Sequence, residues 1–268
     1  MKRKISLFIA IMMLLTIALC SCNDEPAEPV ARTDEEIYNT AMGYVSQGSY
    51  ELAYAALLSI KSYDKAAAAL QDFYYLPVLM TEKEADDKEK KDYDITSFTY
   101  DKSGNITMKN TVIEGQSQGF ETFSYEDGLL KYSTLMDIEG KKGTSKYTFD
   151  GDGKLIEVFI TDSNENFAKT EYKYDEDGKL SEEIATDFDG SVVTSKFSYG
   201  ENGKILSKLS YKETDDNTET VMKCEYTYNA QGLLSTATKT AGDKKTTVEY
   251  SGHKLYYMPE YRDIMLYY

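Results

Sequence analysis

The side chains that most often carry out catalysis are scarce in this chain. It has 268 residues, with one histidine, His253, and three cysteines. A histidine-activated nucleophile would need His253 beside Cys224, but the two lie in different predicted hairpins and no signal brings them together. We predict an exposed turn histidine and a buried, inert thiol. One histidine and one such thiol are too few for the usual zinc site, so we expect no enzyme activity, no metal and no cofactor.

Carboxylates are abundant, with 46 Asp and Glu against 30 Lys and Arg, and a net charge of −16. An acidic pair of the glycosidase kind is an open alternative. However, Asp101, Asp150 and Asp175 recur at one position of a repeated turn, and turn geometry already explains them. Clustered acids such as Asp150 and Asp152 leave weak calcium binding open. A chain this acidic has no basic stripe for nucleic acid.

These turns belong to a repeat within residues 95–258. Each copy has two aromatic residues at alternate positions, then a turn, then an aliphatic residue. The second aromatics lie 22 to 29 residues apart, at Tyr100, Tyr125, Phe149, Tyr174, Tyr199, Tyr228 and Tyr250. An acceptor that opens the turn, with glycine three residues later, is typical of a β-hairpin with a G1 bulge. The clearest turn residues are Asp101 and Gly104, Asp150 and Gly153, Asp175 and Gly178, and Asn229 and Gly232.

About seven such hairpins predict an antiparallel β-meander with one aromatic and one polar face, curled by its twist. The pattern Tyr-x-Tyr-Asp-x-x-Gly-Lys-Leu, clearest at 147–155 and 172–180, resembles the YD repeat of RHS proteins. The resemblance implies a hairpin array of the kind that RHS proteins use as a β-shell around a toxin. This chain has too few copies for a closed shell.

Residues 1–22 are predicted to be a lipoprotein signal peptide. A basic start precedes an apolar stretch that is short for a membrane span, and its end, Leu19-Cys20-Ser21-Cys22, resembles a bacterial lipobox. The resemblance implies cleavage before Cys22 and its acylation, so acyl chains would bind the membrane. Residues 23–32 form an acidic, proline-containing tether that resembles the surface-export signal of some Gram-negative lipoproteins. We expect a cell-envelope protein, lipid-anchored to the outer membrane, and leave its periplasmic or outer-surface face open.

Residues 33–80 predict a helical segment. Thr33 and Glu36 fit a capping box, and three helices are expected before Pro77. The run Gly48-Ser49-Tyr50-Glu51-Leu52-Ala53 resembles the start of the second helix of a tetratricopeptide repeat, and a helical cap over the first sheet edge is the alternative role. Residues 81–94 are predicted to be a charged linker, and residues 259–268 a C-terminal capping tail.

Together these features predict an α+β fold, with a short N-terminal helical segment followed by a curled antiparallel β-meander of about seven YD-like hairpins. The predicted function is binding or scaffolding by a non-enzymatic, membrane-anchored envelope protein with an envelope protein or glycan as partner. A glycan- or peptide-binding module with exposed tyrosines is one alternative, and a hydrolase with an acidic pair is another. The sequence leaves open the ligand, the oligomeric state and whether the sheet closes.

Overall fold

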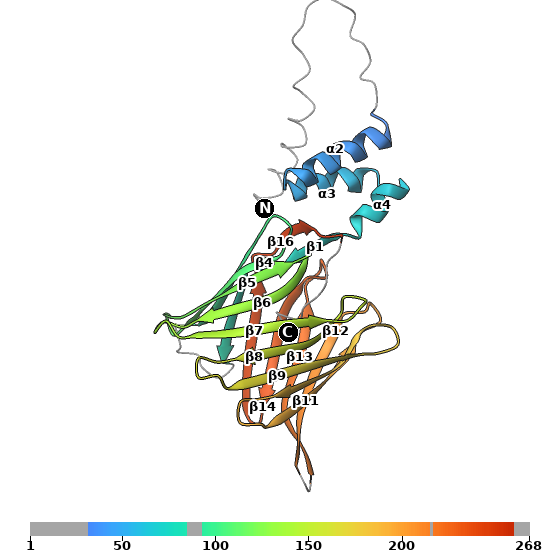
Figure 1. Ribbon diagram of the computed structural model, residues 1–268. Coiled ribbons are helices and arrows are strands. Elements are labelled where there is room, and N and C mark those ends of the chain that lie inside the picture. Colours follow the sequence, from blue (N-terminus) through green and yellow to red (C-terminus); the bar gives the residue numbers. More distant parts are fainter. Residues whose placement is uncertain (1–31, 85–92, 215–216, 260–268) are drawn as a thin grey trace, which may run out of the picture.

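The computed structural model of the chain describes residues 32–84, 93–214 and 217–259. It consists of a β-barrel with a small helical cap over one end (Figure 1). We call the capped end of the barrel the mouth and the opposite end the base.

Fourteen antiparallel strands form the barrel, and each pairs with the next in the chain. Their bounds are β2 (Leu79–Glu84), β3 (Asp94–Tyr100), β4 (Ile106–Ile113), β5 (Gln116–Glu126), β6 (Leu129–Met136), β7 (Lys142–Phe149), β8 (Leu155–Thr161), β9 (Phe167–Tyr174), β10 (Leu180–Thr186), β11 (Val192–Tyr199), β12 (Ile205–Thr214), β13 (Asn217–Tyr228), β14 (Leu234–Ala241) and β15 (Lys244–Ser251).

The barrel closes where β15 pairs with β2, with residues 79–84 in register against 246–251. On the outer face the ammonium of Lys83 lies 2.8 Å from the Glu249 carboxylate across this seam. The expected α+β fold with an open, curled meander is therefore wrong. The linker predicted at 81–94 overlaps a barrel strand, because Thr81–Glu84 belong to β2.

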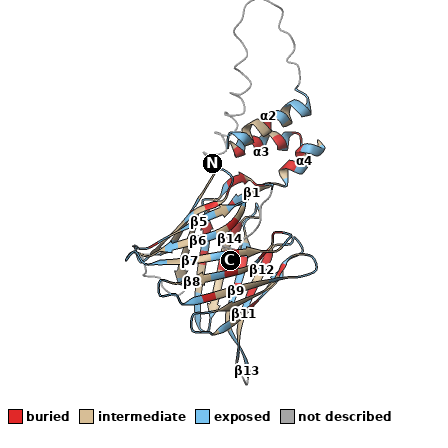
Figure 2. Ribbon diagram, viewed as in Figure 1, coloured by how far each residue is buried: buried red, intermediate tan, exposed pale blue. Residues whose placement is uncertain are grey.

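Successive side chains of each strand point alternately to the inside and the outside of the barrel, so the two faces differ in burial (Figure 2). Inward side chains at the mouth and middle are mostly large and belong to one buried cluster that includes Phe98, Phe123, Tyr147, Tyr226 and Val248. Nearer the base, the strand registers place small residues on the inward face, among them Gly143, Ala168, Ala185 and Ala241. Bulky side chains therefore fill the upper barrel, whereas small residues on several strands leave more room in the lower barrel.

The cap contains three short helices and a two-stranded sheet. These elements are α2 (Asp34–Ser46), α3 (Tyr50–Ser59), α4 (Asp64–Leu70), β1 (Phe73–Leu76) and β16 (Lys254–Tyr257). The predicted capping box at the start of α2 is confirmed, because Thr33 Oγ1 accepts from the Glu36 amide and the Glu36 carboxylate accepts from the Thr33 amide.

The cap rests on the turn between β3 and β4. The Tyr50 hydroxyl donates to the Lys102 carbonyl, and the rings of Tyr100 and Tyr256 lie 5.4 Å apart. A Cβ atom on Gly104 would lie 2.6 Å from the sulfur of Met258, so this position needs glycine for close approach. The cap is thus fixed above one side of the mouth.

Two resemblances are corrected by this architecture. The YD-like motifs do not form an RHS-type repeat array or shell, because the hairpins that carry them are staves of one closed barrel. The helical segment is not a tetratricopeptide unit, because α4 ends at Leu70 and the chain continues as β1, which pairs with β16. Aromatic residues 73–75 favour this strand over the expected continuation of the third helix.

Candidate functional site

The predicted turn residues all lie at the mouth. The side chains of Asp101, Asp150, Asp175 and Asn229 accept hydrogen bonds from backbone amides of their own turns, at 2.7 to 3.0 Å. The four matching glycines, Gly104, Gly153, Gly178 and Gly232, have φ between 76° and 80°. Each of these side chains accepts hydrogen bonds within its own turn, so turn geometry accounts for them without a catalytic role.

A ladder of tyrosines links neighbouring turns around the mouth. The hydroxyls of Tyr174, Tyr199 and Tyr228 donate to the carbonyls of Leu155, Leu180 and Ile205, at 2.7, 2.8 and 2.8 Å. Each carbonyl belongs to the residue that follows the turn of the preceding hairpin. The repeated aromatic therefore joins one hairpin to the previous one.

Lysines reinforce the same ladder. The ammoniums of Lys154, Lys179 and Lys204 lie 5.2, 5.7 and 4.9 Å from the ring centres of the three ladder tyrosines, within cation–π range. The motif Gly-Lys-Leu, or Gly-Lys-Ile at 203–205, thus supplies the cation and the carbonyl for the next tyrosine. This relation between copies explains why the motif recurs.

A cavity of about 1120 Å³ lies between the cap and the mouth. Its cap side is formed by Tyr54 of α3 and by the aromatics of β1, Phe73, Tyr74 and Tyr75. Its barrel side is formed by the ladder tyrosines and by the aliphatic residues that follow the turns, Leu155, Leu180, Ile205 and Leu234. A cavity of this size with aromatic walls suits a sizeable organic ligand.

Five polar or charged side chains also line this cavity: Asp152, Lys154, Lys204, Gln231 and His253. His253 is half-buried rather than exposed as predicted, and its Nε2 atom is buried without a hydrogen-bond partner in the described chain. Burial lowers the pKa of His253, and a hydrogen bond to the Leu234 backbone partly opposes this shift. The neutral imidazole is therefore favoured, as a hydrogen-bonding group of the cavity wall.

The barrel interior carries a second polar feature, a belt of three lysine–glutamate pairs. Their Nζ to carboxylate distances are 3.5, 2.8 and 3.1 Å for Lys109–Glu121, Lys208–Glu183 and Lys239–Glu82. The second and third pairs reach across the strand between them, β11 and β15 respectively. Ser195 lies on β11, the strand that the Lys208–Glu183 pair spans. It is buried and hydrogen-bonded to Ser210 at 2.9 Å, and it is small enough to leave room for the pair.

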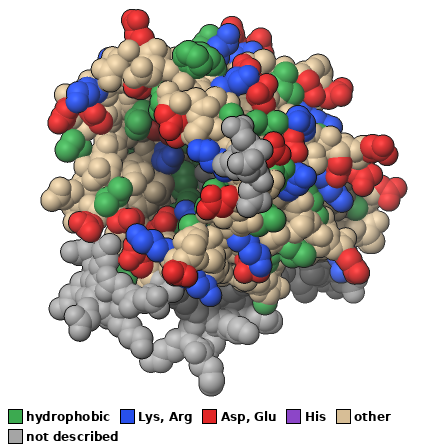
Figure 3. Space-filling model, turned by 90° about the horizontal axis from the view of Figure 1, so that it is seen from below, with side chains coloured by type: hydrophobic (Ala, Val, Ile, Leu, Met, Phe, Trp, Pro, Cys, Tyr) green, Lys and Arg blue, Asp and Glu red, His purple; other side chains and the backbone are tan. Residues whose placement is uncertain are grey.

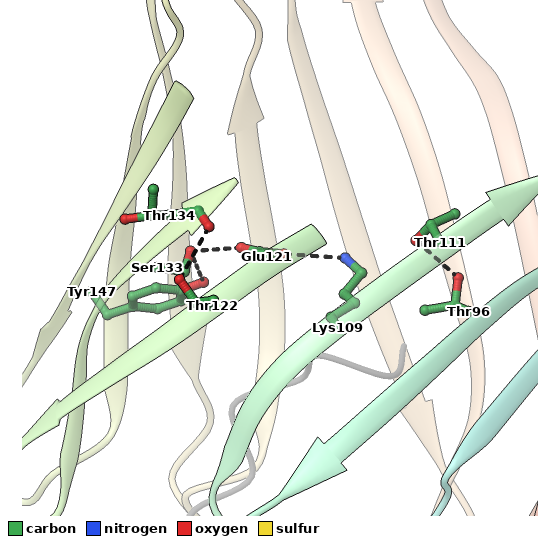
Figure 4. Close-up of polar contacts among 8 residues, drawn as sticks. All are labelled: Thr96, Lys109, Thr111, Glu121, Thr122, Ser133, Thr134 and Tyr147. Carbon is green, nitrogen blue, oxygen red and sulfur yellow. Dashed lines mark hydrogen bonds and ion pairs between the residues drawn. The ribbon is translucent and has the colours of Figure 1, made fainter. Parts of the chain in front are cut away.

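The first pair extends into a chain of hydrogen bonds (Figure 4). Ser133 donates to Glu121 at 2.6 Å, and its oxygen lies 3.3 Å from the Tyr147 hydroxyl. Burial raises the pKa of Tyr147 to about 12, with the bond to Ser133 acting against it, so the phenol stays protonated and donates. The charged groups of the belt are paired with one another, so the belt does not need an outside ligand.

The middle of the barrel is closed by its own side chains. Phe98, Tyr147, Lys208, Cys224 and Val248 face inward from strands around the barrel, and all have exposed fractions of 9% or less. Viewed from the base, the barrel is hollowed, with lysine and apolar side chains visible inside (Figure 3). A packed layer of side chains therefore separates the mouth cavity from the hollow at the base.

Other predicted features are placed as follows. Cys224 is buried in the middle layer, and burial raises the pKa of its thiol, whereas His253 lies at the mouth. No group of three or more His, Cys, Asp or Glu suited to a metal ion occurs in the described ranges. Cys22, residues 23–31 of the tether and the tail beyond Pro259 lie outside those ranges. No helix among the described residues is long and apolar enough to span a membrane.

Sequence reasoning missed the mouth cavity and the interior pairs. The cavity brings the 54–77 and 149–234 regions together, and only the final topology could predict this. The pairs join residues up to 157 positions apart. The segment at 79–84 gave little signal, because Glu82 and Glu84 share the inward face with Met80 and so replace the apolar–polar alternation that marks a half-buried strand.

No protein-family model matches the chain, and no curated protein matches it. Among solved structures, it is similar to a porin-like protein from Bacteroides uniformis, with 12% identity and a TM-score of 0.39, over 65% of this chain and 97% of that one. A porin-like protein from Bacteroides vulgatus gives 12% identity and a TM-score of 0.41, over 66% and 98%. Because both scores are below 0.5, the barrel is described from the strand pairing of this chain alone.

The Lys208–Glu183 pair makes a testable contribution to stability. The two side chains are only 11% and 17% exposed, so Lys208→Met should leave a buried, unpaired carboxylate and destabilise the fold by about 3–5 kcal/mol. The double variant K208M/E183M should regain most of this loss. Lys223→Met, which breaks the outer pair with Glu225 at 50% and 56% exposure, should cost less than about 1 kcal/mol.

Denaturant unfolding of the four proteins, including the parent, measures these differences. Equal destabilisation by Lys208→Met and Lys223→Met would contradict the view that the interior pair is shielded from water.

Proposed function

We propose that this chain is a non-enzymatic, lipid-anchored protein of the cell envelope that binds a glycan in the cavity beneath its cap. The observation that carries the proposal is the cavity itself, whose walls combine partly exposed aromatic rings with a few polar groups. Aromatic faces pack against the C–H faces of sugar rings, while lysine, glutamine and histidine can bond sugar hydroxyls.

The outer face of the barrel supports a position in water rather than in lipid. Outward positions carry charged and hydroxylic side chains on strand after strand, such as Lys142, Thr144, Lys146 and Thr148 on β7 and Lys223, Glu225 and Thr227 on β13. A membrane-spanning barrel presents an apolar band about 25 Å tall, where each Lys near the midplane costs about 2–4 kcal/mol. The acyl anchor expected at Cys22 would then hold the domain to the membrane.

The packed middle layer supports binding over solute passage. Buried side chains such as Phe98, Tyr147 and Val248 occupy the interior, so solute entering the mouth would meet side chains rather than a continuous lumen. A ligand in the mouth cavity would instead stop against this layer.

Lipid anchoring is tested by metabolic labelling. Cells that express the full-length chain with radiolabelled palmitate should give a labelled protein in the membrane fraction, because the lipobox-like end implies acylation of Cys22. Cys22→Ala should lose the label, whereas the neighbouring Cys20→Ala should keep it. A Cys22→Ala protein that still carries palmitate would contradict this anchor.

Glycan binding is tested by calorimetry against a panel of soluble neutral and acidic oligosaccharides. We expect at least one to bind, and Tyr75→Ala to weaken it at least tenfold, about 1.4 kcal/mol, because Tyr75 lines the cavity and is 41% exposed. Tyr132→Ala is the matched control, since Tyr132 is 51% exposed but lies on the outer face.

Two results would contradict the proposal. The first is an absence of binding across the whole panel, especially if unstructured peptides bind instead. The second is glycan binding that Tyr132→Ala removes and Tyr75→Ala leaves unchanged.

A further inference from the structure

The mouth cavity is lined by more basic than acidic side chains, whereas the chain as a whole is acidic. The chain has a net charge of −16, yet among the described residues the cavity lining contains Lys154 and Lys204 against one carboxylate, Asp152. Acidic residues thus predominate over most of the surface and give way to lysines at this site. Such a local reversal is what attracts an anionic ligand.

Neither cavity lysine has a carboxylate partner within the described chain. Nine ion pairs are found there, and they involve other lysines. Lys204 donates to the Gly232 carbonyl, and Lys154 lies over the Tyr174 ring. An ammonium has three donors, so each lysine keeps donors for a ligand.

Glycine leaves room for both lysines. A Cβ atom on Gly178 would lie 2.9 Å from the Lys154 ammonium, and one on Gly232 would collide with the Lys204 ammonium. Each lysine therefore extends over the glycine of the next turn along the cavity wall. Both side chains are half-buried, whereas Lys179, between them in the ladder, is exposed and does not line the cavity.

The spacing of the two lysines limits the ligand. Lys154 follows the turn from β7 to β8, and Lys204 follows the turn from β11 to β12, four strands further around. At about 4.8 Å per strand their attachment points are roughly 19 Å apart along the wall. One carboxylate is too small to bind at both points, which favours a ligand with acid groups at intervals.

We infer that the mouth cavity recognises an acidic oligosaccharide, in which carboxylates bind Lys154 and Lys204 and sugar rings pack against Tyr54, Tyr74 and Tyr75. This inference rests on the proposed glycan-binding function and specifies its ligand class. The lysines of the turn motif then have two roles. Lys154, Lys179 and Lys204 all stabilise the tyrosine ladder, and Lys154 and Lys204 also bind the acid groups of the ligand.

The test compares a galacturonic acid tetrasaccharide with its carboxyl-reduced, neutral counterpart, by calorimetry at low salt. The parent protein should bind the acidic probe at least tenfold more tightly. Lys154→Gln and Lys204→Gln should each remove most of this preference, so that each variant binds the two probes with affinities within about threefold of each other. Lys204→Arg, which keeps the charge, should retain it.

Lys179→Gln is the matched control, because it removes the same charge and the same ring contact between the two sites without touching the cavity. It should leave the preference unchanged, and unfolding midpoints should show that all the variants are folded. An equal loss in Lys179→Gln would overturn the inference in favour of unspecific charge attraction.

The remaining outcomes separate the inference from the proposed function. Equal binding of the two probes, with both weakened by Tyr75→Ala, would overturn the acidic ligand and keep glycan binding. Binding of neither probe, nor of any other glycan in the panel, would overturn both.

Discussion

The pairing of β2 with β15 is the interaction on which the rest of this structure depends. A fourteen-stranded sheet with free edges would expose rows of unpaired N–H and C=O groups. Joining the first strand to the last removes both edges at once. It also fixes the circumference, and with it the width of the interior that side chains and cap must fill.

That width explains how the interior is organised. Side chains just fill an eight-stranded barrel, whereas larger barrels enclose cavities or channels. Here a buried aromatic and aliphatic layer occupies the middle, paired charges satisfy one another against the wall, and the cap covers the mouth. The space left between the cap and the turns is the cavity, so the cavity is a consequence of covering a wide barrel with a small cap.

The tyrosine ladder relates the sequence repeat to this geometry. In the barrel, Lys179 and Leu180 of one copy contact Tyr199 of the next, so the motif is a connection between hairpins. This accounts for the resemblance of the sequence to a repeat protein although the fold is a single closed sheet.

Much of the local structure was readable from sequence, and the closure was not. The Asp-x-x-Gly turns and alternating aromatics of residues 95–251 predict hairpins, and β3 to β15 lie there. The first barrel strand, β2, could not be predicted because its inward Glu82 looks like a solvent-exposed charge. Its partner, Lys239, is 157 residues away in the sequence. The run at 73–75 was ambiguous in the same way, since a short apolar stretch suits a helix or a strand until its partner is known. The mouth cavity depends on both of these elements and could not be predicted before them.

The most direct test of the account is a disulfide across the seam. Lys83 and Thr247 are direct partners on β2 and β15, close enough for a bond between cysteines. K83C/T247C should therefore oxidise to a monomer whose digest contains a peptide linking the two positions. K83C/T238C places its cysteines level with each other but two strands apart, about 9.6 Å, and should not link. If K83C/T247C stayed reduced within the chain, or linked only between molecules, the sheet would have open edges and the closed barrel would be contradicted.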